Sequence, residues 1–220
     1  MNNIIDTIKE KYSEEVGISF TLFELLTFIL YTCASYVLFC EEKNSVWGTI
    51  LTKSIDAILF SDNSFIKKAR VSDYIISLIL TFVTVFLYKK ASSLLYDRLA
   101  KIKNVEEYVD RVKNKYNIKN IDNQAMRIYM ANAANEEKRM HLKKVTNIKG
   151  IGLLSFSIAV SSLLSVFTPN MIDFLALIGG LVMFLFVQWL VFASYTSQVV
   201  PRLVLEKLLR NEDVHFNDEL

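Results

Sequence analysis

The sequence predicts an all-α integral membrane protein that crosses a bilayer four times. Three observations lead to this prediction. Of the 220 residues, 52% are hydrophobic and the mean hydropathy is +0.30, which is more apolar than is usual for a soluble domain. The hydrophobic residues are concentrated in four stretches with almost no charge. Strongly charged segments separate these stretches, an alternation typical of multi-pass membrane proteins.

Each stretch is long enough to cross the hydrocarbon core, or nearly so. The first contains a single charge, Glu24, and its length and the lack of a small-x-small site exclude a cleaved signal peptide. The second is shorter than the roughly 20 residues that a bilayer needs. Its flanking Lys89 and Lys90 extend it, because long basic side chains reach the interface. The predicted spans are residues 20–40, 74–88, 150–167 and 174–195.

The distribution of lysine and arginine predicts the orientation. The segment 89–149 holds 15 of the 25 basic residues, whereas 41–73 holds five against five acids. The positive-inside rule therefore places 89–149 in the cytoplasm. With four spans, both termini are cytoplasmic too, and the connections between spans one and two and between spans three and four face outward. The non-spanning segments are residues 1–19, 41–73, 89–149, 168–173 and 196–220.

Small and polar residues predict how the spans pack. Helices gain no hydrophobic free energy by meeting in lipid, so close approach and hydrogen bonds hold them together. Serines recur every fourth residue in the third span, and a second stripe of small residues in the fourth span is expected to pack against them. Two alternatives stay open: the serines line a pore, or they bond only to their own helix carbonyls. The predicted helix-packing residues are Ser157, Ser161, Ser165, Ala176, Gly180 and Gln188.

Three of the acids in or next to the spans have an expected role. Glu24 lies about one turn inside the first span. Insertion of a charged residue at the centre of a membrane helix costs about 2.5–3.5 kcal/mol, and the cost is smaller near the membrane edge. We expect it to reach the interface or to pair with Lys89, Lys90 or Lys149; an ion or proton pathway is the alternative. Asp73 and Asp173 precede spans two and four and are expected to cap their N–H groups.

The basic insert is predicted to be a helical hairpin. Apolar residues repeat every three or four positions from 95 to 116, a turn follows, and a second helix begins near residue 123. The apolar stripe of the first helix is the predicted docking face for a soluble cytoplasmic protein, with anionic lipid as an alternative ligand. Direct nucleic-acid binding is disfavoured, because acids are interleaved and no binding motif is present. The docking face comprises Leu95, Leu99, Ile102, Val105, Val109, Val112 and Tyr116.

An amphipathic helix over residues 46–60 is predicted in the outward segment. Its apolar face suits a helix lying on the outer membrane surface, where it would sense changes in lipid packing. Alternatively it packs on the spans as a lid. The residues of this face are Trp47, Ile50, Leu51, Ile55 and Ile58. At the other end of the chain, a short amphipathic helix is expected to begin at Pro201.

The sequence contains no motif for catalysis, a metal or a cofactor. It has no P-loop, no GxGxxG, no HExxH and no CxxC. The two histidines, His141 and His215, are far apart in sequence and lie in polar surroundings. We therefore expect a non-enzyme without cofactors. Its expected partners are the lipid bilayer, a soluble cytoplasmic protein and further copies of itself.

The whole layout resembles a known bacterial family. In its four spans, basic cytoplasmic insert and tight outward turn, the chain resembles the membrane subunit of the Kiwa antiphage defence system. The resemblance implies an oligomeric inner-membrane protein that works with a soluble DNA-binding subunit. It also implies a sensor that detects phage-related membrane disturbance and signals to a cytoplasmic effector. The layout is similar to that of immunity proteins against pore-forming colicins as well. An ion channel and a toxin-immunity protein therefore remain the alternatives to a sensor and scaffold.

Overall fold

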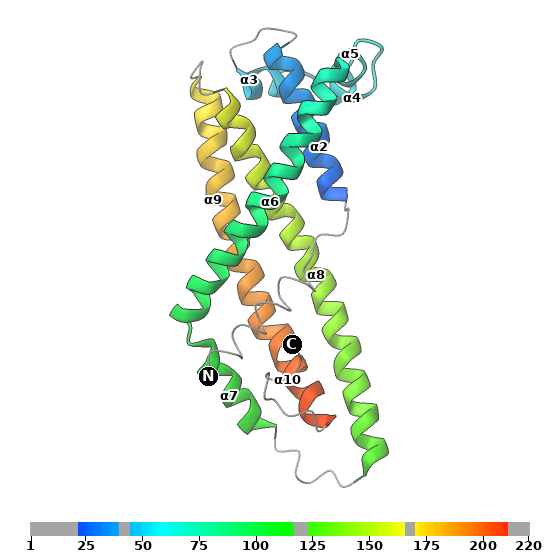
Figure 1. Ribbon diagram of the computed structural model, residues 1–220, viewed down its shortest axis with the longest axis vertical. Helices are drawn as coiled ribbons and strands as arrows, with labels where there is room; N and C mark the ends of the chain where they lie inside the picture. The colour runs from blue at the N-terminus through cyan, green and yellow to red at the C-terminus, as the bar shows by residue number, and fades with distance from the viewer. Residues whose placement is uncertain (1–21, 40–44, 117–122, 166–169, 211–220) are drawn as a thin grey trace. The chain divides into compact units, whose positions relative to one another are not determined.

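A computed structural model describes residues 22–39, 45–116, 123–165 and 170–210 (Figure 1). Within these ranges the regular structure is helical and no strand occurs. This confirms the all-α prediction for the described part of the chain. The elements are α2 (Leu22–Phe39), α3 (Val46–Leu51), α4 (Ile55–Leu59), α5 (Phe65–Lys68), α6 (Val71–Ile102), α7 (Val105–Lys115), α8 (Gln124–Leu164), α9 (Met171–Ser194), the π-helical turn η2 (Tyr195–Val199) and α10 (Val200–Leu209).

Four helices are long and apolar enough to cross a membrane: α2, α6, α8 and the continuous helix from α9 to α10. They indicate a multi-pass membrane protein. Three of them extend well beyond the predicted spans. At 1.5 Å per residue the 41 residues of α8 reach about 60 Å, twice the hydrocarbon thickness of roughly 30 Å. The predicted second helix of the insert and the third span are therefore one helix.

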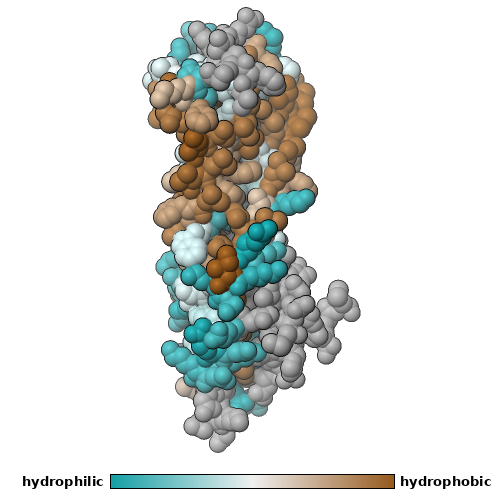
Figure 2. Space-filling model, turned by 90° about the vertical axis from the view of Figure 1, so that its left-hand side faces the viewer, coloured by the Kyte–Doolittle hydropathy of each residue, from teal (hydrophilic) through white to brown (hydrophobic). Residues whose placement is uncertain are grey.

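The chain divides into two compact units, each discussed for its described residues. We call Ile18–Lys90 and Gly150–Val187 the apolar unit, and Met1–Gly17, Ala91–Lys149 and Gln188–Leu220 the charged unit. Helices α6, α8 and α9 contribute residues to both units. Figure 2 shows mostly hydrophobic surface on the apolar unit and mostly hydrophilic surface on the charged unit.

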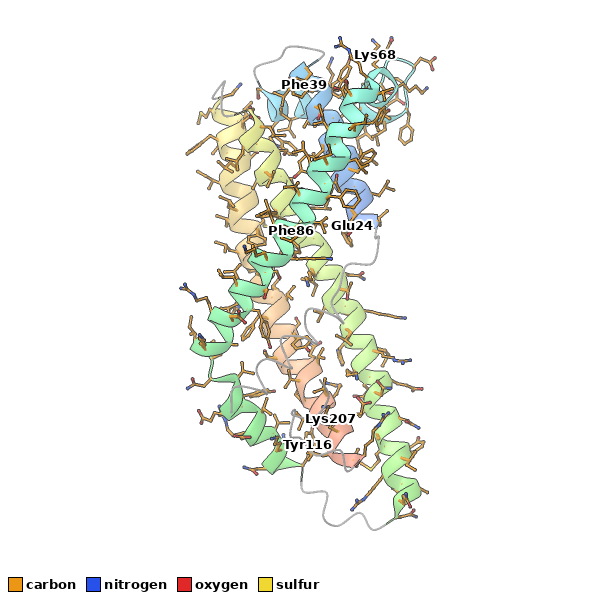
Figure 3. All side chains as sticks on the ribbon, viewed as in Figure 1. Glu24, Phe39, Lys68, Phe86, Tyr116 and Lys207 are labelled. Atoms are coloured by element: carbon orange, nitrogen blue, oxygen red, sulfur yellow. The ribbon has the colours of Figure 1, made fainter. Side chains whose placement is uncertain are left out.

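In the apolar unit, α6 and α9 carry the hydrophobic exterior. Only 28% of the most apolar window of either helix is buried, against 50% for α2 and α8. Phe86 on α6 is 67% exposed, and Figure 3 labels it there. Inside the unit, the rings of Tyr88, Phe156 and Phe184 join α6, α8 and α9, with centroids 5.0–6.1 Å apart. The exposed residues include Leu78, Ile79, Phe82, Val83, Phe86, Phe174, Leu175, Ile178, Val182, Leu185 and Phe186.

The predicted single helix over 46–60 is wrong: the structure has short helices with serine caps. The side chains of Ser45, Ser54 and Ser64 each accept a backbone N–H at the start of α3, α4 and α5. Serine caps compete with helix continuation, which explains the breaks.

These short helices pack on α2 at one end of the apolar unit (Figure 1). The rings of Phe65 and Tyr36 pack against each other in a tilted arrangement with centroids 5.0 Å apart, and Val46 is completely buried. The lid alternative therefore matches the contacts. Of the predicted surface face, Trp47, Ile50 and Ile58 are partly buried, whereas Leu51 and Ile55 remain about 70% exposed.

In the charged unit the helix predicted from 95 to 116 is broken after Ile102. Asn104 adopts a left-handed conformation with φ 45° and ψ 57°, which asparagine tolerates better than most residues. The chain changes direction there, and α7 packs against α10. Because of this packing, Val105, Val109 and Val112 are buried within the chain.

The junction of α9 and α10 is a widened turn. The backbone N–H of Val200 bonds to the carbonyl of Tyr195, a π-helical step, and Pro201 follows directly. Proline lacks an N–H and its ring collides with the carbonyl four residues earlier, so a wider turn accommodates it. The helix expected from Pro201 is thus present, but as a continuation of α9.

Candidate functional site

The interior of the apolar unit contains a seam of hydroxyl groups. Tyr31 of α2 is completely buried, and its Oη lies 2.7 Å from Oγ1 of Thr84 on α6. Thr27, one turn earlier on α2, lies 3.3 Å from Oγ of Ser157 on α8. We call Thr27, Tyr31, Thr84 and Ser157 the polar seam. It ties α2 to two other helices through hydrogen bonds.

At Ser157 the serine stripe therefore meets a different neighbour from the one expected. Ser157, Ser161 and Ser165 are all buried, but the interhelical hydrogen bond of Ser157 runs to α2. The hydroxyls of these serines also donate to carbonyls three or four residues earlier in the chain. Bonds of this kind were one of the alternatives stated for the stripe.

Helices α8 and α9 meet on another face of α8. A Cβ placed on Gly180 would lie 2.8 Å from the Ser155 carbonyl oxygen and 2.9 Å from the Ala159 nitrogen. Residues 155 and 159 share one helix face, and Ser157 lies on the opposite one. Gly180 thus permits close packing against α8, while Ala176 is only partly buried. The expected pairing of Gly180 with the serine stripe is wrong in its choice of face.

Glu24 lies at the start of α2 and is 7% exposed (Figure 3). Its side chain is thus inside the apolar unit rather than in solvent. Of the three lysines considered as partners, Lys89 and Lys90 are exposed, and Lys149 is buried. A fixed, buried carboxylate fits the expectation of a paired charge better than that of a side chain reaching into solvent.

The two predicted capping aspartates act differently. Asp73 accepts a bond from the N–H of Arg70 at the start of its own helix, as expected. Asp173 instead accepts the N–H of Trp47 at 2.8 Å, so it caps α3 and ties α9 to that short helix. The start of α9 is capped by Asn170, whose side chain accepts the N–H of Ile172.

Gln188 joins helices in the charged unit. It is 3% exposed and accepts a hydrogen bond of 2.8 Å from Ser92 of α6. Below it, the ring of Tyr96 packs edge-on against Phe192 and Tyr195, with centroids 5.5 and 6.3 Å away. The role proposed for Gln188 from sequence, a bond between helices, matches this geometry.

A network of ion pairs connects α8 to α10. Lys138 Nζ lies 2.9 Å from Glu206 Oε2, and both side chains are 11% exposed. Arg202 pairs with Glu137 at 2.8 Å, and Arg210 pairs with the second oxygen of Glu206 at 3.2 Å. Figure 3 shows Lys207 on this helix and Tyr116 at the end of α7. The C-terminal helix is therefore held from two sides by salt bridges to α8 and by the valines of α7.

The predicted docking face is largely occupied by the chain itself. Val105, Val109 and Val112 are buried, Leu95, Leu99 and Tyr116 are partly buried, and only Ile102 is exposed. An apolar stripe of this kind predicts contact without naming the partner. Here the chain's own α10 supplies it, a correction to the expectation of a free surface.

Sequence reasoning missed most of the polar seam, although the signal was present. Polar residues on α2 recur at 24, 27, 31 and 35, and on α6 at 77, 81, 84 and 88, all with helical spacing. Every one of these residues is buried. Two more stripes like the serine stripe were therefore readable from the sequence.

The chemistry available to these groups is hydrogen bonding and packing. Within the described ranges, no group of three or more His, Cys, Asp or Glu side chains is placed to hold a metal ion.

Compared with protein-family models, with curated proteins and with solved structures, the chain matches none of them.

Proposed function

We propose that the protein is a membrane-embedded sensor and scaffold whose charged unit recruits a soluble effector in the cytoplasm. One observation carries the proposal: three candidate spans continue as unbroken helices into the charged unit. A continuous helix passes a shift or rotation of its membrane segment to the residues beyond the bilayer. The exposed apolar surfaces of α6 and α9 support lipid contact, and the basic segment 89–149 supports the cytoplasmic orientation.

The setting belongs to the same proposal. The layout resembles Kiwa membrane subunits, which supports a bacterial inner membrane, a homo-oligomer and a role in antiphage defence. Native mass spectrometry of the protein released from nanodiscs would give the number of copies. A strict monomer would contradict the oligomer.

The surface that meets the effector has to lie outside the α7–α10 contact. On α8, Met126, Tyr129 and Met140 share one helix face and are 49%, 70% and 58% exposed. An apolar face of this kind on a water-facing helix suits a protein partner better than solvent.

Affinity purification from the native host tests this surface. We expect the Tyr129→Glu variant to lose a soluble protein that co-purifies with the unchanged chain. The Ile102→Ser variant is the matched control, because Ile102 is 73% exposed but lies on α6. The proposal fails if no soluble protein co-purifies with the unchanged chain, or if both variants lose it equally.

An ion channel is the second candidate, and the polar seam is the observation that favours it. Hydroxyls buried between α2, α6 and α8 resemble a polar path across the apolar unit. Purified protein in liposomes separates the two functions. The scaffold predicts no ion flux above that of empty liposomes, and the channel predicts flux that changes in the Tyr31→Phe variant.

A further inference from the structure

The charged unit contains a cavity with mixed basic and aromatic walls. Its volume is about 290 Å³, and it lies between the end of α6, α7 and the last turns of α9. The side chains that define its chemistry are Lys103, Tyr108, Arg111, Trp189 and Phe192. Ligand pockets usually begin at about 300 Å³, so the cavity suits a small headgroup rather than a whole large molecule.

Two cations point to a negatively charged ligand. Lys103 Nζ lies 5.3 Å from the centroid of the Trp189 ring, a cation–π contact that fixes the ammonium group at the wall. The Arg111 guanidinium lies 3.9 Å from Glu107, a long ion pair that leaves most of its five N–H donors available. Lysine and arginine together are the usual recognition groups for phosphate.

A phenol adds a neutral donor. Burial raises the pKa of Tyr108 above its ordinary value of 10, the nearby Tyr116 raises it further, and Arg111 opposes them. The Tyr108 hydroxyl thus keeps its proton at neutral pH and is able to donate to an anion.

The apolar wall lies close to the expected edge of the bilayer. Trp189 follows Gln188, which bonds to Ser92 of α6, and Ser92 comes just after Lys89 and Lys90. These lysines are the first charges after the apolar run of α6. Along α9, the 18 steps from Met171 to Trp189 cover about 27 Å, close to the roughly 30 Å of hydrocarbon. Tryptophan at this depth is typical of the membrane interface.

We infer that this cavity binds the phosphate headgroup of an anionic phospholipid from the adjoining leaflet. Lys103 and Arg111 contact the phosphate, and the rings of Trp189 and Phe192 face the glycerol and the first methylenes. The inference rests on the proposed membrane embedding, but not on recruitment of an effector. A free phosphate ion shares the charge chemistry but leaves the aromatic wall without a ligand.

Fluorescence of Trp189 provides the test. The chain has two tryptophans, so the Trp47→Phe variant keeps Trp189 as the only tryptophan, and excitation at a wavelength that tyrosine does not absorb isolates its emission. Full-length protein is placed in phosphatidylcholine nanodiscs with increasing fractions of phosphatidylglycerol. We expect a saturable change in emission. In this background the Arg111→Gln variant, which keeps the Lys103 contact, should raise the half-saturating fraction of phosphatidylglycerol about fivefold. The double variant Lys103→Gln with Arg111→Gln should raise this fraction roughly thirtyfold.

The matched control removes two other charges from the same unit, by Lys101→Gln with Lys115→Gln; both lysines are exposed. If the lipid is held only by general charge attraction, the two double variants should weaken its binding equally. If it is held at a specific site, only the double variant of Lys103 and Arg111 should weaken it. Native mass spectrometry of retained phosphatidylglycerol gives a second readout that does not depend on the tryptophan environment.

Three results would overturn the inference. The first is equal weakening by the cavity pair and the control pair. The second is no response of Trp189 to phosphatidylglycerol. The third is the same response when inorganic phosphate is added to pure phosphatidylcholine nanodiscs, which would assign the site to a free anion. Any of these results, for a protein that enters nanodiscs normally, refutes only the lipid site. Failure of the protein to enter nanodiscs at all refutes the membrane embedding.

Discussion

The two units of the chain bury different proportions of polar and apolar side chains. In the apolar unit, the residues with the least exposure include Thr27, Ser157 and Ser161, while large hydrophobic residues such as Phe86 face outward. In the charged unit, Val109 and Val145 are completely buried, and lysines and glutamates cover the surface. Among the described residues, the interior of the apolar unit is therefore rich in polar side chains, whereas the interior of the charged unit is mainly apolar.

This difference indicates the solvent of each unit. In water, burial of apolar surface contributes roughly 25 cal/mol per Å², so valines and aromatic rings go inside. In lipid, that gain is lost between helices, and hydrogen bonds and close backbone contacts hold the helices together. The polar seam and the Gly180 contact are of the kind expected in lipid. The buried valines between α7 and α10 are of the kind expected in water.

The largest expected effect concerns the buried ion pair of the charged unit. Glu206→Leu leaves Lys138 buried without its partner, and we expect a loss of about 3–5 kcal/mol in the free energy of unfolding. Adding Lys138→Met should restore most of it, because the apolar pair fills the same space without a buried charge.

Thermal unfolding in detergent, followed by circular dichroism, measures both variants. Asp110→Ala is the control, since Asp110 is exposed, its ion pair with Lys113 is 3.7 Å long, and the loss of this pair should cost no more than about 1 kcal/mol. If Glu206→Leu costs no more than this control, α10 is not held by the buried pair.

The next effect compares two adjacent glycines of the apolar unit. Gly180→Ala places a methyl group against the backbone of Ser155 and Ala159 and should cost about 1–3 kcal/mol. Gly179 has no atom within 4 Å of the added Cβ, so Gly179→Ala should be neutral or stabilise by up to about 1 kcal/mol through helix propensity. The difference in unfolding temperature between the two variants is the measurement. Equal temperatures would show that α8 and α9 do not meet at Gly180.

The smallest effect concerns the polar seam. A double-mutant cycle with Tyr31→Phe and Thr84→Val isolates their hydrogen bond of 2.7 Å. Hydrogen bonds between membrane helices contribute about 0.6 kcal/mol on average and about 1.7 kcal/mol at most, so we expect a coupling free energy in that range. A coupling indistinguishable from zero would mean that the seam is a consequence of packing and not one of its causes.

Hydropathy alone was enough to predict the four apolar helices, because length and the lack of charge determine which segments can cross lipid. The lack of Gly and Pro from residue 88 to 99 predicts that the second span continues past Lys89 and Lys90 without a break, and α6 does so. The joining of the third span to the helix before it was missed, since the basic residues near Lys143 suggest a boundary that the backbone ignores.

The errors share one physical cause: periodicity identifies a face but not its neighbour. The stripe through Val105, Val109 and Val112 was correctly apolar, yet only the fold brings α10 against it. Ser157 of the serine stripe bonds to another helix, yet nothing in the sequence distinguishes α2 from α9 as its contact. Local breaks were missed for another reason, because Ser54 and Asn104 end helices by geometry that hydropathy does not record.

The central claim is that lipid surrounds the apolar unit and water surrounds the charged unit. Cysteine labelling in nanodiscs, after both native cysteines are replaced by alanine, tests it most directly. Four variants have similarly exposed positions: Phe82→Cys and Val182→Cys in the apolar unit, at 62% and 59%, and Ile102→Cys and Met140→Cys in the charged unit, at 73% and 58%. A water-soluble maleimide should label the last two fully while the first two stay unreactive. Comparable labelling of all four would contradict the claim.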